Sequence, residues 1–220
     1  MHWSVDELTP ARRYSLAIGL VVPRPIAVVG TVAPDGRTNL APFSYYSMLS
    51  SEPFMLGFCP ANDEQGGEKD TLRNCKPRWE GGTGVFTVGV ATDAIIRRVV
   101  ACGESLPYGE SEFDLSGLTP VPGLSVAAPR IAESPACFEC ETFQVIRFGP
   151  GVPSAGNLVI GRVVRVHVDE RVLDERQRVD PAKLDAIGRM GGISYARTRE
   201  RFELPVGRGA LSHGSGRTPA

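Results

Sequence analysis

Apolar and polar positions alternate along several short segments of the chain, and this period of two predicts β-strands. The clearest case is residues 157–168, in which five apolar residues share one face: Leu158, Ile160, Val164, Val166 and Val168. Apolar, β-branched runs bounded by turn residues predict further strands at 26–32, 38–43, 54–59, 85–90 and 136–148. The turn sequence APDG at 33–36 makes the first two of these a hairpin.

Capping residues and helical periodicity predict three short helices. Thr9-Pro10 places a capping hydroxyl before a proline, which predicts a helix over 11–20. Thr92-Asp93 is expected to cap a helix that ends near residue 102, and Asp180-Pro181 one that ends near residue 187. Six or seven strands joined by hairpins, with so few helices, predict an antiparallel barrel in the mainly-β class.

The chain divides into three parts. Residues 1–22 are expected to form a helical segment that packs on the barrel, and residues 23–204 the barrel domain itself. Residues 205–220 are rich in Gly, Ser and Arg with almost nothing to bury, so we expect a disordered tail. Residues 103–132 form a long loop-rich connection, and such connections inside a compact domain are more often lids or binding loops than linkers.

Composition excludes several classes of protein. The 220 residues are 42% hydrophobic and 22% charged, with a net charge of −1, which is ordinary for a globular domain. No basic block supports nucleic-acid binding, and no apolar run approaches the roughly 20 residues that span a membrane. The N-terminus lacks the pattern of a signal peptide, so a cytoplasmic location is expected.

Few side chains are suited to catalysis on their own. The five cysteines include Cys137 and Cys140, but residues three apart on a strand point to opposite faces, so neither a metal site nor a redox pair is predicted. His167 lies on a predicted strand and is expected at its surface or rim. The dinucleotide-binding G-x-G-x-x-G, the P-loop, H-E-x-x-H and G-x-S-x-G are all absent. No catalytic residue is assigned, and an enzyme of this kind would need a cofactor.

A hydroxyl-rich segment follows the first hairpin and reads NLAPFSYYSMLSS over residues 39–51. Ser44, Ser47 and Ser50 recur every three residues, so a turn-like or 3₁₀ conformation would align them. Aligned hydroxyls could bind the edge of a heteroaromatic ring or a ribityl chain. Taken alone, the segment is better explained as a polar loop after a strand.

Lys69 changes that balance. The chain has 21 arginines and only three lysines, and Lys69 opens the sequence KDT where a helix should begin. Asp70 or Thr71 could cap this helix, and a lysine beside free helical amides is a common way to hold a phosphate. The alternative is an exposed lysine next to a capping residue.

The chain resembles the flavin reductase-like, FMN-binding split-barrel family associated with flavoprotein oxygenases. Motifs in family order and spacing cover residues 5–204, and they read PRPIAVVGT, DGRTNLAPFSYYSMLSSEP, KDTLRN, ESPACFECETFQVI, NLVIGRVVRVHVDE and IGRMGGISYAR. The resemblance implies a six-stranded antiparallel split barrel of Greek-key type with short peripheral helices. It also implies a homodimer with FMN near its interface. Asn157 stands where family members often carry a histidine.

The resemblance also assigns expected FMN-binding residues. The segment that lines the flavin ring and ribityl chain matches Asn39, Pro42, Ser44, Ser47 and Ser50, and the one that holds the phosphate matches Lys69 and Thr71. Arg24, Thr31, Arg189 and Tyr195 match positions near the pocket.

Three functions stay open from the sequence. The leading one is an FMN-dependent oxidoreductase that takes hydride from NADH or NADPH and supplies reduced flavin to a partner oxygenase. The second is an FMN-binding electron-transfer protein without nicotinamide activity, and the third is a cofactor-free interaction module.

Overall fold

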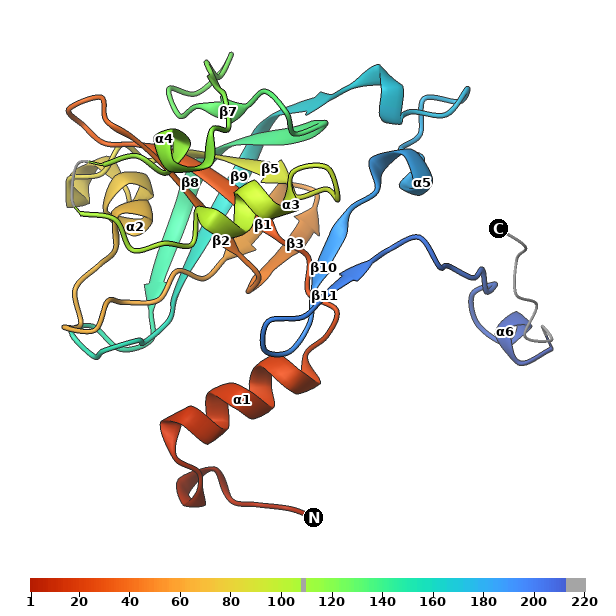
Figure 1. The fold of residues 1–220 in the computed structure, drawn as a ribbon, viewed down its shortest axis with the longest axis horizontal. Coiled ribbons are helices and arrows are strands. Elements are labelled where there is room, and N and C mark those ends of the chain that lie inside the picture. The colour runs from red at the N-terminus through yellow and green to blue at the C-terminus, as the bar shows by residue number, and fades with distance from the viewer. Residues whose placement is uncertain (108–109, 213–220) are drawn as a thin grey trace.

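The structure is a computed structural model that describes residues 1–107 and 110–212, and the statements below refer to those residues (Figure 1). The main sheet contains β1 (Ala27–Val32), β2 (Thr38–Phe43), β3 (Tyr46–Ser51), β4 (Phe54–Phe58), β5 (Val85–Val90), β8 (Ala136–Arg147) and β9 (Asn157–Val168). Two small ribbons pair β6 (Pro120–Val121) with β7 (Arg130–Ile131), and β10 (Ile187–Arg189) with β11 (Tyr195–Arg197). The helices are α1 (Pro10–Leu20), α2 (Asp70–Cys75), α3 (Ile96–Ala101), α4 (Glu112–Ser116), α5 (Pro181–Leu184) and α6 (Gly209–Ser212), with 3₁₀ turns η1 (Val5–Glu7), η2 (Arg78–Glu80) and η3 (Glu170–Val172).

The seven-stranded sheet is antiparallel and curls into a split barrel whose edges are not paired with each other. Its strand order is β2-β1-β5-β8-β9-β4-β3, so β2 and β3 are the two edges. Only Ser44 and Tyr45 separate these strands in sequence, and the sheet must therefore curl until its edges approach each other. The predicted mainly-β split barrel is confirmed.

The main sheet has seven strands, one more than the six that the resemblance implied and within the six or seven that the sequence pattern predicted. The extra strand is β3, which lies within the hydroxyl-rich segment and pairs with β4 through Tyr46↔Phe58 and Ser51↔Phe54. The expected turn-like or 3₁₀ conformation of this segment is therefore wrong. Backbone hydrogen bonds to a neighbouring strand hold it extended, and a pattern of serines carries no signal for that pairing.

Strand β1, next to the edge strand β2, is buried on both faces, which explains its nearly continuous apolar sequence. Val28 belongs to a core formed with α3 and α4, in which Val99 and Phe113 are also buried. Ala27 and Val29 point into the barrel, where they meet residues of α2, β4 and β5. The aromatic centre of the barrel is well packed, and the rings of Phe58 and Phe86 lie 5.2 Å apart edge to face.

Two predicted helices have different bounds from those expected, and one agrees. Helix α1 begins as predicted, with the Thr9 hydroxyl accepting a hydrogen bond from the Arg12 N–H. Helix α3 begins only at Ile96, because residues 92–95 form a bridge and a turn beside the β10 strand. Helix α5 is a single turn capped by Asp180, and Ile187 belongs to β10 instead.

Helix α1 contains no buried residue, and Figure 1 shows it below the barrel, with the chain entering the barrel from its C-terminal end. Its described contacts include hydrogen bonds from the Arg24 guanidinium to the carbonyls of Ile18 and Val21, and the packing of residues 1–22 on the barrel stays a prediction. Of the predicted disordered tail, residues 205–212 are described and contain the short helix α6, whereas residues 213–220 lie outside the described residues. No described helix has the length and hydropathy to cross a membrane.

A buried carboxylate anchors the long loop between α4 and β8. The Glu139 side chain is fully buried and accepts hydrogen bonds from the backbone N–H groups of Leu124, Ser125 and Val126. The half-buried His167 contacts the same carboxylate through Nε2. Burial alone would raise the pKa of Glu139, but these hydrogen bonds outweigh it and lower the pKa to about 2.

Candidate functional site

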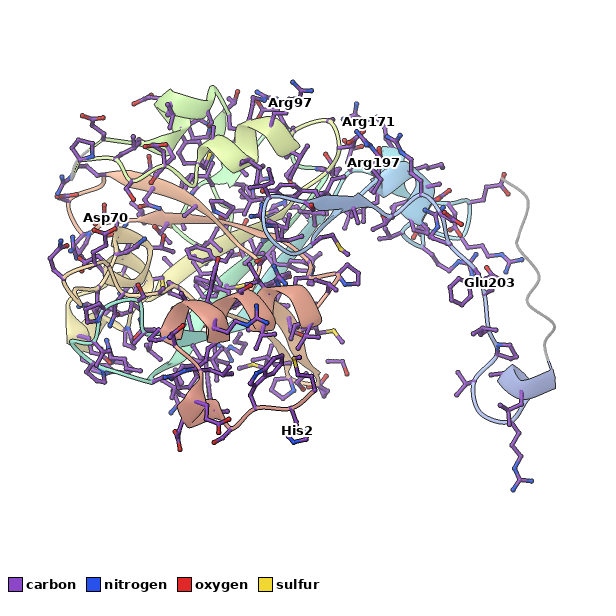
Figure 2. The ribbon with its side chains drawn as sticks, turned by 60° about the horizontal axis from the view of Figure 1, so that its bottom comes forward. His2, Asp70, Arg97, Arg171, Arg197 and Glu203 are labelled. Atoms are coloured by element: carbon purple, nitrogen blue, oxygen red, sulfur yellow. The ribbon has the colours of Figure 1, made fainter. Side chains whose placement is uncertain are left out.

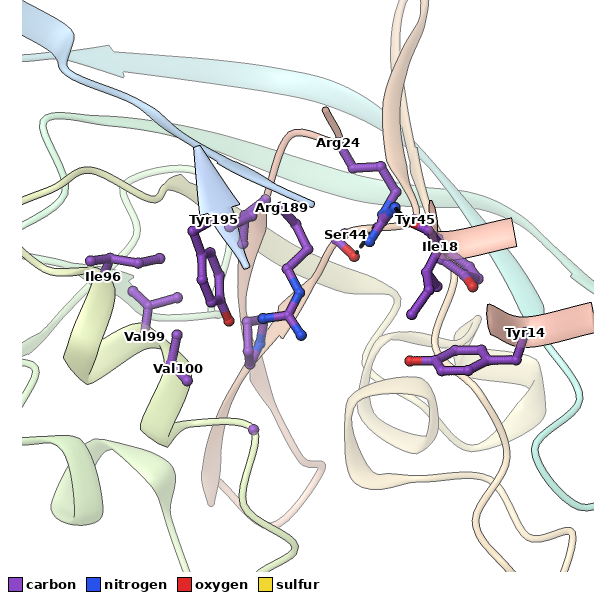
Figure 3. A pocket seen from close by; sticks show the side chains of 13 residues that line it. Tyr14, Ile18, Arg24, Ser44, Tyr45, Ile96, Val99, Val100, Arg189 and Tyr195 are labelled. Atoms are coloured by element: carbon purple, nitrogen blue, oxygen red, sulfur yellow. Dashed lines mark hydrogen bonds between the residues drawn. The ribbon is translucent and has the colours of Figure 1, made fainter. Parts of the chain in front are cut away.

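Two cavities lie side by side next to β2, and both are lined by Pro42 and Gly103. The first cavity has a volume of about 430 Å³ and is lined by α1, the end of β2, α3 and the β10–β11 hairpin (Figure 3). The second has a volume of about 310 Å³ and is lined by β2, the start of α2 and the loop that follows α3. Both are in the size range of small-molecule sites in proteins.

Two buried hydrogen bonds hold α2 against the β1–β2 hairpin. The Asn39 side-chain amide donates to the Thr71 hydroxyl at 3.2 Å, and the Asn74 amide donates to the Thr31 hydroxyl at 3.1 Å. All four side chains are at most 7% exposed. These bonds fix the start of α2 at the second cavity, which is where Lys69 lies.

Lys69 stands at the N-cap position of α2 and takes no part in capping. The helix begins at Asp70, so neither Asp70 nor Thr71 is the cap that the sequence suggested. Within the described part of the chain, the Lys69 ammonium has no hydrogen bond or ion pair, whereas Lys76 is paired with Glu68 at 2.8 Å. Lys69 therefore presents an exposed ammonium without an ion pair at the edge of the second cavity, whose lining also contains Asp63, Asp70, Glu104 and Glu112.

Most of the other charges of the second cavity already have partners. Asp70 is paired with Arg73 at 2.9 Å, and the Asp63 carboxylate accepts N–H bonds that close a turn. Glu112 is buried and accepts a hydrogen bond from the Leu40 N–H at 2.9 Å. Burial raises the pKa of Glu112, although the bond from Leu40 opposes this shift.

Arg24 organises the first cavity. Its guanidinium is buried and donates to the backbone carbonyls of Ile18, Val21 and Met190 at 2.7, 2.6 and 3.0 Å. Its Nε–H donates to the Ser44 hydroxyl at 3.2 Å. Arg24 thus ties α1, the segment after β10 and the end of β2 together. Because the Ser44 oxygen accepts this bond, its own O–H can donate into the cavity.

The first cavity has a positive and aromatic lining. Arg24 and Arg189 line it with no acidic residue, and the Arg189 guanidinium stacks on the ring of Tyr195 at 4.4 Å (Figure 3). Tyr14 and Tyr45 add two further rings from α1 and the β2–β3 connection. Such a lining suits a planar, electron-rich ligand that carries partial negative charge.

The structure gathers most of the residues that the sequence singled out. Eight of the eleven line the two cavities: Arg24, Asn39, Pro42, Ser44, Lys69, Thr71, Arg189 and Tyr195. Thr31 is buried behind them as the partner of Asn74. Ser47 and Ser50 lie on β3 and line neither cavity, and their hydroxyls make local bonds to Met48 and Glu52.

Some lining residues carry no sequence signal. Glu112 and Tyr14 come from two short helices that are far from β2 in sequence, and only the fold brings them to the cavities. Asn157 is buried elsewhere, where its amide donates to the Pro60 carbonyl and to the Asn62 side chain. Asn157 therefore orders the loops at the start of β9, and it lines neither cavity.

Comparison with known proteins agrees with this geometry. A family model described as "Flavin reductase like domain" matches residues 19–186, which is most of the chain. The chain belongs to this family. The match includes β1 to β9 and both sides of the second cavity.

Solved structures support the same assignment. Nitrilotriacetate monooxygenase component B from Bacillus cereus is 31% identical, with a TM-score of 0.84 over 93% of this chain and 98% of that one. The 2-nitrobenzoate 2-nitroreductase NbaA of Pseudomonas fluorescens is 30% identical, with a TM-score of 0.82 over 94% and 97% of the two chains. A putative flavin reductase with split barrel domain from Shewanella frigidimarina shares the fold at 22% identity, with a TM-score of 0.78 over 94% and 100%.

Proposed function

We propose that this protein is an FMN-dependent NAD(P)H:flavin reductase that supplies reduced flavin to a partner oxygenase. The observation that carries the proposal is the pair of adjoining cavities, one with an unpaired lysine at its edge and the other lined by arginine, tyrosine and serine. A flavin mononucleotide has the matching polarity, because it joins a dianionic phosphate to a planar ring through a hydroxylated chain.

The residues present fit this cofactor. Lys69 would hold the phosphate, since its charge has no partner among the described residues. The Thr71 hydroxyl accepts a bond from Asn39 and can therefore donate to a phosphate oxygen. In the first cavity Ser44 can donate to a ring or ribityl acceptor, and Arg24 holds that hydroxyl in place.

The chain would contribute binding and orientation, and the cofactor the redox chemistry. When bound, FMN would supply the hydride-transfer chemistry, with NADH or NADPH as the donor. Arg24 and Arg189 bring two positive charges to the first cavity without an acid to neutralise them, which favours a ring that gains electron density. The absence of a Rossmann motif means that the nicotinamide would lie transiently against the flavin instead of in its own domain.

The delivery of reduced flavin to an oxygenase is supported by one relative. Nitrilotriacetate monooxygenase component B is 31% identical over nearly the whole chain, and its name makes it part of an oxygenase system. A nicotinamide-dependent reaction also agrees with the expected cytoplasmic location.

A homodimer belongs to the same proposal. Helix α1 has no buried residue, and its apolar side chains are exposed: Tyr14 is 62% exposed and Leu20 is 77% exposed. The edge strand β3 likewise exposes Met48 and Leu49. A second copy of the chain would cover such apolar surface next to the first cavity. Sedimentation that shows a monomer with full FMN affinity would contradict a site at the dimer interface.

The function is tested by mixing purified protein with FMN and either NADH or NADPH. We expect oxidation of at least one nicotinamide, dependent on both FMN and protein. No oxidation of either above background would overturn the reductase. Bound, redox-active FMN in such an inactive sample would favour the electron-transfer protein, and a lack of FMN affinity would favour the interaction module.

A further inference from the structure

A third cleft lies between α3 and the β10–β11 hairpin, on the other side of Tyr195 from Arg189. It has a volume of about 330 Å³, and its walls are mainly apolar, with Ile96 and Val100 on one side and Ile187 and Ala196 on the other. Tyr195 lines both this cleft and the first cavity. Figure 3 shows its ring between Arg189 and the apolar side chains of α3.

Among the charged side chains that line this third cleft, one arginine has no ion-pair partner among the described residues. Asp93 is paired with Arg197 at 3.0 Å and with Arg199 at 2.8 Å. Arg97 is exposed and also lines the cleft (Figure 2), and its guanidinium makes no hydrogen bond, ion pair or ring contact with any described residue. Arg97 and Arg197 against Asp93 give the lining an excess of one positive charge.

We propose that the third cleft binds a monoanionic aromatic carboxylate, with its ring against Tyr195 and α3 and its carboxylate on Arg97. Apolar walls on both sides favour a ring over a hydrated polar ligand. The planar guanidinium of Arg97 matches a carboxylate with two parallel hydrogen bonds. A single excess charge suits a monoanion better than a phosphate.

The position of this ligand gives it a functional setting. Because Ile96, Val100 and Tyr195 line the first cavity as well, the bound acid would lie next to the proposed flavin site. The assignment goes beyond the flavin reductase activity, since it names a ligand for a separate cleft. It can also be tested without flavin.

The test uses 2-naphthoate, whose fluorescence anisotropy reports binding to the flavin-free full-length chain. Two probes separate the contributions: 2-naphthalenemethanol keeps the ring without the charge, and cyclohexanecarboxylate, measured by competition, keeps the charge without the aromatic ring. We expect both to bind at least about tenfold more weakly than 2-naphthoate. Equal binding of the alcohol would overturn the role of Arg97, and no binding of 2-naphthoate below about 1 mM would overturn the site.

Variants locate the binding. Arg97→Gln should weaken 2-naphthoate binding about tenfold, whereas Arg162→Gln, which removes the same charge from an exposed position on β9, should leave it unchanged. Ala196→Leu should also weaken it, because the larger side chain fills the third cleft. FMN affinity, measured in parallel, should be the same in Arg97→Gln and the wild type. Equal loss in both arginine variants, or full affinity in Arg97→Gln, would refute the proposal.

Discussion

Replacing Lys69 with alanine should weaken FMN binding selectively. A charge-assisted hydrogen bond contributes about 1.5–3 kcal/mol, which corresponds to about 10- to 150-fold in affinity. The lower part of this range applies, because Lys69 is exposed and solvent screens its charge. Arg73 is paired with Asp70, so Lys69 is the only cation of the second cavity without an ion pair among its described neighbours. Without it, a phosphate would face Glu104 and Glu112, and the other cation of the lining, Arg73, is already paired with Asp70.

The assay is a flavin fluorescence titration with FMN and with riboflavin, which lacks the phosphate. Wild-type protein should prefer FMN, and Lys69→Ala should lose most of that preference while its affinity for riboflavin changes little. This comparison isolates the contact between the lysine and the phosphate from any effect on the ring site.

A matched control is available in Lys76, which is paired with Glu68 and lines neither cavity. Lys76→Ala changes the net charge by the same amount and should leave the preference for FMN intact. The reasoning is refuted if both lysine variants lose affinity equally, or if Lys69→Ala binds FMN as tightly as the wild type.

Two further predictions concern the ring site and the stability of the fold. Ser44→Val should lower flavin affinity or shift the flavin absorption bands. The control Ser51→Val, on the exposed part of β3, should change neither. An unaltered spectrum and Kd for Ser44→Val would reject the contact. Glu139→Gln should lower the free energy of unfolding at pH 7 by about 2–3 kcal/mol in denaturant titrations, because a pKa held near 2 instead of 4.5 is equivalent to about 3 kcal/mol. The stabilisation by the Glu139 carboxylate is complete above its unfolded pKa and is lost as the pH falls from about 5 to 2. Glu139→Gln should therefore lack this part of the acid-induced loss of stability. The control Glu141→Gln, at an exposed position, should retain it. A variant as stable as the wild type at pH 7 would show that the Glu139 carboxylate does not anchor the loop.

Local patterns were sufficient for most of the barrel. Six of the seven main strands follow from β-branched runs and period-two alternation, since burial on one or both faces dictates those residues. Strand β3 was not predicted, because an edge strand with serine at several positions has the composition of a loop. The late start of α3 was not predicted either. Thr92 and Asp93 have the sequence of a helix cap, but Thr92 forms a bridge with Ala186 and Asp93 pairs with Arg197.

The candidate site was predictable to a similar degree. β2 and the start of α2 contribute most of the predicted cavity residues. These two segments lie close together in sequence, so their motifs together predicted a binding site. Glu112 and Tyr14 reach the cavities from distant segments, and only tertiary packing could assign them. Arg24 was expected near the pocket, but its role as a buried link between three segments depends on the backbone carbonyls that surround it.

The most direct measurement is a crystal structure of the protein grown with FMN. We predict a flavin whose phosphate lies within about 4 Å of the Lys69 ammonium and whose ring occupies the first cavity beside Ser44 and Arg189. A flavin bound with its phosphate at any other surface, or crystals that contain no flavin at saturating concentration, would contradict the account.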